Sequence, residues 1–297
     1  MPRCVNVPRY IGCSTYLGRY LPGYALLDSH PPRLYTSTHQ SEQFELIGPS
    51  SPTKMSQEVI LFDLPDRHNP PKSWSLNPWK ALNFKGIPYK TTWVEYPDIE
   101  PLFKSFGIPQ NDPNINPHYP YSIPAAHFPD GKYIMDSLAI AKELEHIQPS
   151  PSLHLDNGYV DKTQKAVLAV LGALAPVAMP RVPELLLNPP SAKYFNETRE
   201  KRFGMPLPEL AKSEKAQNAW NEAEEPTRAL VGLLKENRGS YVAGKEASFA
   251  DLILAGLWRF LQVLDKEGDL WGRMKGSDAV VGEHYEACKG WLERDDR

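Results

Sequence analysis

The segment from Tyr121 to Leu144 constrains the fold of this chain more than any other stretch. It reads YSIPAAHFPDGKYIMDSLAIAKEL and predicts two short strands, a tight turn and then a helix. Asp130-Gly131 is a hairpin signal between the strands expected at 125–128 and 132–135. The residues after it place apolar side chains at helical spacing, at Ile140, Leu144 and Ile147. The middle of the chain is therefore expected to be a β-hairpin that leads directly into a helix.

Two dipeptides flank this hairpin and carry groups that can bind a ligand. Ile123-Pro124 precedes the first strand, and a proline there makes a cis peptide accessible and leaves neighbouring backbone groups available to an outside ligand. Asp136-Ser137 opens the helix, where a hydroxyl and free amides bind anions and the carboxylate suits an ammonium group. Taken singly, the first pair is more often a trans turn and the second only a helix cap. Together they predict a site for a short peptide.

The residues before the hairpin complete a mixed α/β unit. A nearly continuous apolar run at 58–64 predicts a buried strand, and a second strand is expected at 89–94. Between them, Asn77-Pro78 predicts a helix start and Gly86 its end. The order β-α-β, then β-β-α, is typical of the thioredoxin-like fold.

The second half of the chain is expected to be entirely helical. Ser248 to Asp251 is a capping box at the start of a helix over 249–264, which is apolar almost all round and therefore belongs in the centre of a bundle. Other helices are predicted over 161–175, 192–202, 209–236 (with a break near Pro226) and 285–292.

These features resemble the glutathione S-transferase superfamily from about Met55 to Arg297. The blocks at 73–101 and 179–210 resemble a fungal, serine-type branch that is related to bacterial β-etherases. The resemblance implies a thioredoxin-like N-terminal domain over 55–148 and an α-helical, substrate-binding C-terminal bundle over 158–297. It also implies a dimeric, cytoplasmic detoxification enzyme with glutathione as co-substrate.

The resemblance assigns residues to glutathione. The backbone of Ile123, before Pro124, would pair with the cysteinyl part, and Asp136 and Ser137 would hold the γ-glutamyl end. Met179, Arg181 and Val182 lie where the helical half would face the sulfur, so they are candidates for the pocket of an apolar electrophile or aryl ether. For Met179 and Val182, core packing is the competing interpretation.

The loop after the first strand carries the candidate catalytic residues. Ser75 is the first choice for the hydroxyl that stabilises the glutathione thiolate, and Ser73 is the second. Asn77 either caps the following helix or contacts the thiolate. The loop contains no cysteine, which excludes CxxC dithiol chemistry. The helix after the loop is about three residues shorter than the resemblance implies, which keeps open a second function: a glutathione-fold binding or carrier protein without catalysis.

Composition and charge exclude several other classes of partner and site. A net charge of −3 gives no reason to expect nucleic-acid partners, and no apolar run is long enough to span a membrane. No His or Cys spacing indicates a metal site, and three cysteines are too few for a disulfide framework, which favours a cytoplasmic location. Residues 1–54 lack periodicity and are predicted to be a disordered extension. Their three early arginines keep a transit peptide open as an alternative.

Overall fold

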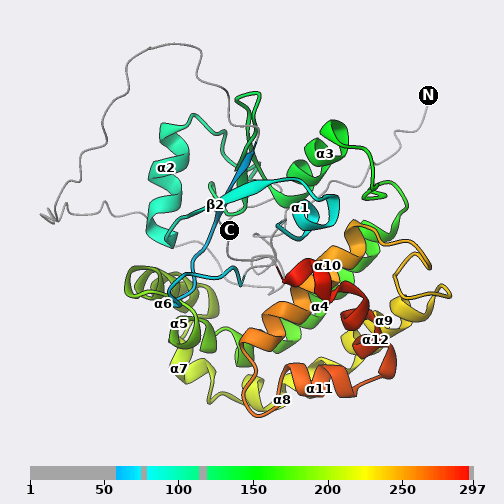
Figure 1. Cartoon of the computed structure of the whole chain (residues 1–297). Helices are drawn as coiled ribbons and strands as arrows, with labels where there is room; N and C mark the ends of the chain where they lie inside the picture. The colour runs from blue at the N-terminus through cyan, green and yellow to red at the C-terminus, as the bar shows by residue number, and fades with distance from the viewer. Residues whose placement is uncertain (1–57, 75–78, 114–118, 294–297) are drawn as a thin grey trace, which may run out of the picture.

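The computed structural model describes residues 58–74, 79–113 and 119–293. The expectations for residues 1–54, for Ser75 and for Asn77 therefore lie outside the described residues. Figure 1 shows a sheet with its helices in the upper part of the molecule and a larger group of helices below it. The predicted fold class is confirmed: a thioredoxin-like sheet precedes a helical bundle. The predicted domain boundaries stay predictions.

The sheet has four strands in the order β2-β1-β3-β4. The central strand β1 (Val59–Asp63) pairs parallel with β2 (Tyr89–Trp93) and antiparallel with β3 (Ala125–His127). β4 (Tyr133–Met135) pairs antiparallel with β3, as the hairpin signal predicts. Four of the five residues of β1 are buried, because helices cover both of its faces.

Two helices lie on one side of the strands and one on the other (Figure 1). α1 (Trp79–Lys85) and α3 (Ser137–Ile147) share a side, and α2 (Ile99–Ser105), which follows the 3-10 turn η2 (Tyr96–Asp98), occupies the opposite one. α1 has seven residues and ends at Gly86, whose φ of +66° suits a residue without a Cβ. The sequence did not predict α2, a helix of seven residues with a proline in its first turn.

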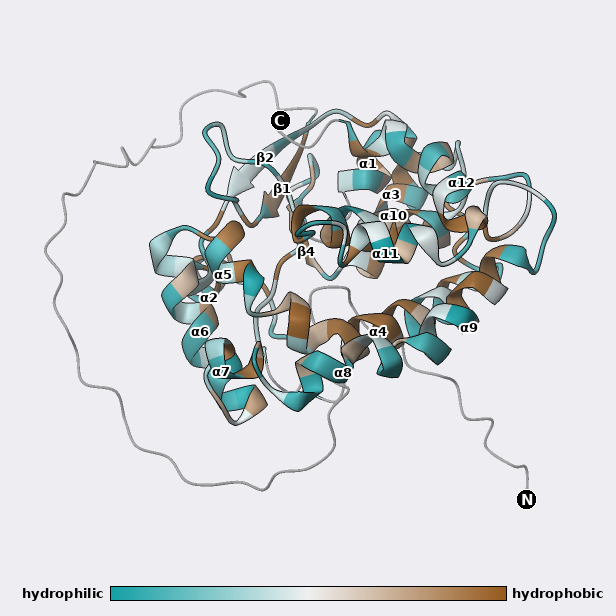
Figure 2. Ribbon diagram, turned by 90° about the horizontal axis from the view of Figure 1, so that it is seen from below, coloured by the Kyte–Doolittle hydropathy of each residue, from teal (hydrophilic) through white to brown (hydrophobic). Residues whose placement is uncertain are grey.

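The second half forms the bundle around two long apolar helices. α4 (Tyr159–Ala178) packs against α10 (Phe249–Val263), and in Figure 2 much of the α4 ribbon has the brown colour of hydrophobic residues. Twelve of the fifteen residues of α10 are buried, which confirms its predicted central place. Around them lie α5 (Arg181–Leu185), α6 (Pro189–Phe203), α7 (Leu207–Leu210), α8 (Glu214–Glu222), α9 (Glu224–Lys235), α11 (Trp271–Gly276), α12 (Ala279–Cys288) and the turn η3 (Lys289–Leu292).

The stretch 209–236, predicted as one long helix with a break near Pro226, contains the end of α7 and the whole of α8 and α9. α8 begins after Ser213, whose hydroxyl accepts a hydrogen bond from the Ala216 amide, and α9 begins at Glu224. The division near Pro226 places that proline in the first turn of α9. A residue in the first turn needs no intrahelical bond from its amide, so a proline is tolerated there.

A buried hydrogen-bond network holds the start of α10. The predicted capping box forms: the Asp251 carboxylate accepts from the Ser248 amide at 2.7 Å and from its hydroxyl at 2.9 Å. Asp251 also accepts from the Val242 amide at 2.7 Å, and it lies 3.1 Å from Nε2 of His284. The Trp258 indole donates to Nδ1 of His284, so the proton of a neutral His284 is on Nε2 and points at Asp251.

Aromatic contacts join the sheet to the bundle. Trp74 stacks on Phe260 of α10 with ring centroids 6.4 Å apart. Phe84 of α1 meets Trp291 edge to face at 5.2 Å, and the neighbouring Asn83 side chain donates to the Trp291 carbonyl at 2.8 Å. The two halves thus share one continuous apolar core.

Candidate active site at the end of the sheet

Strand register brings the predicted residues together at one end of the sheet. Phe62 pairs with Ala125, and Ala125 pairs with Met135. The next residues along these three strands are Asp63, Pro124 and Asp136, which therefore form a row across the strand ends. The Asp136 amide donates to the Pro124 carbonyl at 3.1 Å, which fixes the helix start beside the proline.

The Ile123-Pro124 peptide is cis, as expected. Neighbouring segments hold its loop from two sides. The Asn111 side-chain amide donates to the Tyr119 carbonyl at 2.9 Å and to the Ser122 hydroxyl at 3.0 Å. The Ile123 side chain is buried, so the loop is anchored in the core where the chain enters the inner strand β3.

Asp136 has an unusual backbone at the N-terminus of α3. Its φ is +95°, a region that side chains rarely adopt and that costs on the order of 1–3 kcal/mol. Oδ1 accepts from the Leu138 and Ala139 amides at 2.9 and 3.0 Å, and within the described chain no hydrogen bond to Oδ2 is formed. Burial raises the pKa of this carboxyl above its usual value, although the two amides oppose the shift. Ser137 beside it is buried.

Ser73 is placed in the loop but turned inward. Its hydroxyl donates a hydrogen bond to the Asp63 carboxylate, and the residue is 2% exposed. The backbone of Ser73 bridges to Pro65, which closes the loop on itself. The only proton of this hydroxyl is therefore directed at Asp63.

The expected electrophile pocket is filled by packing. Met179 and Val182 are 1% and 0% exposed, so the core-packing interpretation holds for both. The Arg181 guanidinium forms a forked ion pair with Asp269 and donates to the Leu264 carbonyl at 2.9 Å. Arg181 thus ties α5 to the loop between α10 and α11. Its partner Asp269 lies 88 residues away in the sequence, so no local pattern indicates this ion pair.

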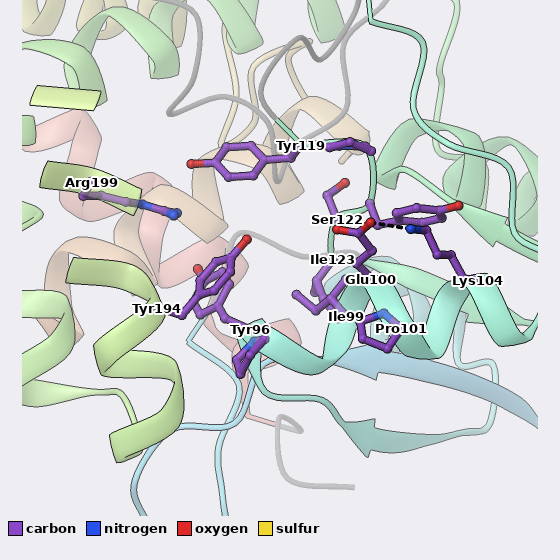
Figure 3. A pocket seen from close by; sticks show the side chains of 13 residues that line it. Tyr96, Ile99, Glu100, Pro101, Lys104, Tyr119, Ser122, Ile123, Tyr194 and Arg199 are labelled. Atoms are coloured by element: carbon purple, nitrogen blue, oxygen red, sulfur yellow. Dashed lines mark hydrogen bonds and ion pairs between the residues drawn. The ribbon is translucent and has the colours of Figure 1, made fainter. Parts of the chain in front are cut away.

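A cavity of about 580 Å³ adjoins the loop before the cis-proline. Of the predicted site residues that the structure describes, it contacts only Ile123, and its other walls come from η2, α2 and α6 (Figure 3). Arg199, Tyr96 and Tyr194 are prominent in it. Sequence reasoning missed them, because their signal is weak: one residue in η2 and two in α6, segments that share no motif and lie almost one hundred residues apart.

Two family models match the chain, one in each half. The glutathione S-transferase N-terminal domain matches residues 73–147, and the glutathione S-transferase C-terminal domain matches residues 160–291. The chain belongs to the glutathione S-transferase family. The superfamily expected from the sequence is thereby confirmed, and the serine-type branch stays a prediction.

Individual relatives agree with this assignment. The glutathione S-transferase-like protein ustS of Aspergillus flavus is 30% identical over 257 residues, covering 75% of this chain and 86% of the relative. A glutathione S-transferase of Ceriporiopsis subvermispora, solved in complex with glutathione, is 31% identical with a TM-score of 0.70, covering 81% of this chain and 100% of that one. A glutathione transferase of Phanerochaete chrysosporium is 31% identical with a TM-score of 0.69, covering 79% and 97%.

Metal-binding side-chain clusters and membrane-spanning helices are both absent from the described residues. Among them, no group of three or more His, Cys, Asp or Glu side chains is arranged to hold a metal ion. None of their helices combines the length and apolar character needed to cross a bilayer.

Proposed function

We propose that this protein is a glutathione transferase that binds glutathione across the backbone of Ile123. The γ-glutamyl end would rest on Asp136 and Ser137. The proposal is carried by one observation: the start of α3 is hydrogen-bonded to Pro124 directly after the cis peptide. The positive end of the α3 dipole and the Ser137 hydroxyl suit a carboxylate, and Oδ2 of Asp136 suits an ammonium group. The strained backbone of Asp136 supports a functional role, because such conformations gather at binding sites.

The reaction would begin with ionisation of the glutathione thiol. A free thiol has a pKa of about 8.5, and about 2.7 kcal/mol of thiolate stabilisation lowers it by roughly two units. We assign the stabilising hydroxyl to Ser75. The alternative, Ser73, directs its single proton at Asp63 and has none left for a thiolate. The thiolate would then attack an apolar electrophile or an aryl ether, and no covalent enzyme intermediate is needed.

Two variants at the start of α3 test the binding site. Asp136→Asn keeps a good helix cap, because asparagine caps as well as aspartate, but it removes the charge offered to the ammonium group. Ser137→Ala removes the hydroxyl. We expect both proteins to fold and to bind glutathione about tenfold more weakly, measured by calorimetry. Unchanged affinity in both variants would contradict the assignment.

Absorbance of the bound thiolate against pH tests the catalytic serine. We expect a bound-thiol pKa about two units below the free value in the wild type and a return towards the free value in Ser75→Ala. Ser73→Ala is the matched control within the same loop and should keep the lowered pKa. The reverse pattern would transfer the role to Ser73.

A specific observation favours a second function. Among the described residues, α1 spans only Trp79–Lys85, and Ser73, the one serine of the loop among them, is committed to Asp63. A glutathione-binding or carrier protein without catalysis would bind glutathione with an unshifted thiol pKa, so the same titration separates the two. Homodimerisation, a cytoplasmic location and a role in detoxification remain predictions from the family resemblance.

A further inference from the structure

The cavity beside Ile123 contains the buried cation Arg199, which has no carboxylate partner among the described residues. Arg199 of α6 is 5% exposed, and its Nε has no hydrogen-bond partner in the part of the chain that the structure describes. Its guanidinium donates to the Thr198 hydroxyl at 2.8 Å, and within the described chain it forms no ion pair. A buried charge is normally paired, so this guanidinium is a candidate receptor for an anion from outside the chain.

Aromatic rings surround the same guanidinium. Its Cζ lies 4.1, 5.5 and 5.3 Å from the ring centroids of Phe195, Tyr96 and Tyr119. Tyr96 stacks nearly parallel on Tyr194, with ring centroids 5.8 Å apart. Rings compensate a cation only in part, but they offer flat surfaces for a planar ligand.

The other charges of the cavity leave Arg199 as its anion-binding end. Lys104 and Glu100 on α2 neutralise each other across 2.6 Å. Arg202, one turn after Arg199, also contacts Tyr119, and burial lowers its pKa to about 10, so it stays protonated at neutral pH. Figure 3 shows Arg199 and Tyr194 on one side of the cavity and the apolar Ile99 and Ile123 on the other. The unneutralised charge of the cavity lining thus lies opposite its apolar wall.

We propose that this cavity binds an aromatic carboxylate, with the carboxylate on Arg199 and the ring between the tyrosines and the apolar wall. The volume of about 580 Å³ lies within the range of pockets for small molecules. Such a ligand would lie next to glutathione bound at Ile123, as a second molecule with its own receptor. Binding of the acid therefore does not depend on catalysis or on bound glutathione.

The experiment compares three probes on the full chain by calorimetry, without glutathione. 3-Phenylpropionate carries both features, 3-phenylpropionamide lacks the charge, and 3-cyclohexylpropionate lacks the aromatic ring. We expect the aromatic acid to bind at least about tenfold more tightly than either analogue. Equal binding of acid and amide would overturn the proposal, and equal binding of the two acids would overturn its aromatic part.

Variants locate the site. Arg199→Met should remove the preference for acid over amide, Arg199→Lys should keep part of it, and the exposed Arg228→Met on α9 is the control that changes net charge equally. Tyr194→Leu, a half-buried position, should weaken binding of the aromatic acid even if Arg199→Met does not fold. A preference that survives both Arg199→Met and Tyr194→Leu would place the acid elsewhere and refute the proposal.

A carboxylate of glutathione is the alternative partner for Arg199. Measuring binding of the aromatic acid in the presence of glutathione distinguishes the two ligands. We expect the acid to bind with similar affinity in saturating glutathione and Arg199→Met to retain glutathione binding. If glutathione displaces the acid competitively and Arg199→Met weakens both equally, Arg199 serves the carboxylate of the peptide and the proposal fails. That outcome would leave the proposed transferase function intact, whereas loss of glutathione binding alone would leave the cavity proposal intact.

Discussion

Replacing Asp251 with asparagine is expected to destabilise the protein severely, although the side chain hardly changes in size. The carboxylate is fully buried and receives four donors: the Val242 amide and His284 on Oδ1, and the Ser248 amide and hydroxyl on Oδ2. In Asp251→Asn, Oδ1 still accepts, but an NH₂ group replaces Oδ2 and faces the Ser248 amide. Two donors then oppose each other in the core.

The magnitude follows from these contacts. A lost hydrogen bond to a charged group costs about 1.5–3 kcal/mol, and a buried amide left without an acceptor adds about 1–3 kcal/mol. The Ser248 hydroxyl can rotate and accept from the new NH₂ group, so we expect a total loss of about 3–5 kcal/mol. Domains are stable by only about 5–15 kcal/mol, so this is a large fraction. It corresponds to a decrease in Tm of roughly 6–20 °C.

Urea denaturation followed by tryptophan fluorescence measures the effect, because Trp258 itself donates to His284 in this network. Asp278→Asn is the matched control: the same substitution at the N-cap of α12, where the side chain is 26% exposed and accepts from Val280. It should cost less than about 1 kcal/mol. If Asp251→Asn loses no more stability than Asp278→Asn, the buried network does not hold the bundle as argued.

Three further outcomes concern Arg181, Asp269 and Cys288. Arg181→Met should lower the free energy of unfolding by about 1–2 kcal/mol without changing glutathione affinity, and Asp269→Asn added to it should cost little more, since both remove one ion pair. Arg181 lowers the pKa of Asp269, so the pair stabilises fully above the unfolded pKa of about 3.9. The gap between wild type and Arg181→Met should shrink as the pH falls below that value; a gap constant down to pH 2 would refute this. Burial raises the pKa of the Cys288 thiol. In a Cys4→Ser, Cys13→Ser background, a thiol reagent at pH 8 should therefore react only after denaturation.

Local chemistry explains how much of the fold was predictable. The hairpin, the end of α1 at Gly86 and the capping box of α10 were predicted correctly, because each depends on residues within one turn or one hairpin. The two dipeptides of the candidate site are only thirteen residues apart, since Ser137 follows Pro124 through one hairpin. The chain could not place them far from each other.

The failures at the candidate site involve partners that are distant in the sequence. Asp63 turns Ser73 inward from ten residues away, and Asp269 engages Arg181 across 88 residues. No local pattern reveals which surface will receive a charged side chain, because its energy depends on the groups that packing brings within hydrogen-bond distance.

The sequence by itself therefore determined the order of the elements, the family resemblance and the row of groups at the end of the sheet, since steric preferences and short-range hydrogen bonds decide these. Only the tertiary structure decided the cavity around Arg199. Its walls come from η2, α2, the loop before Pro124 and α6, which meet only after the bundle packs against the sheet. A buried guanidinium among tyrosines has no signature in a polar helix, because burial is a property of the packed molecule.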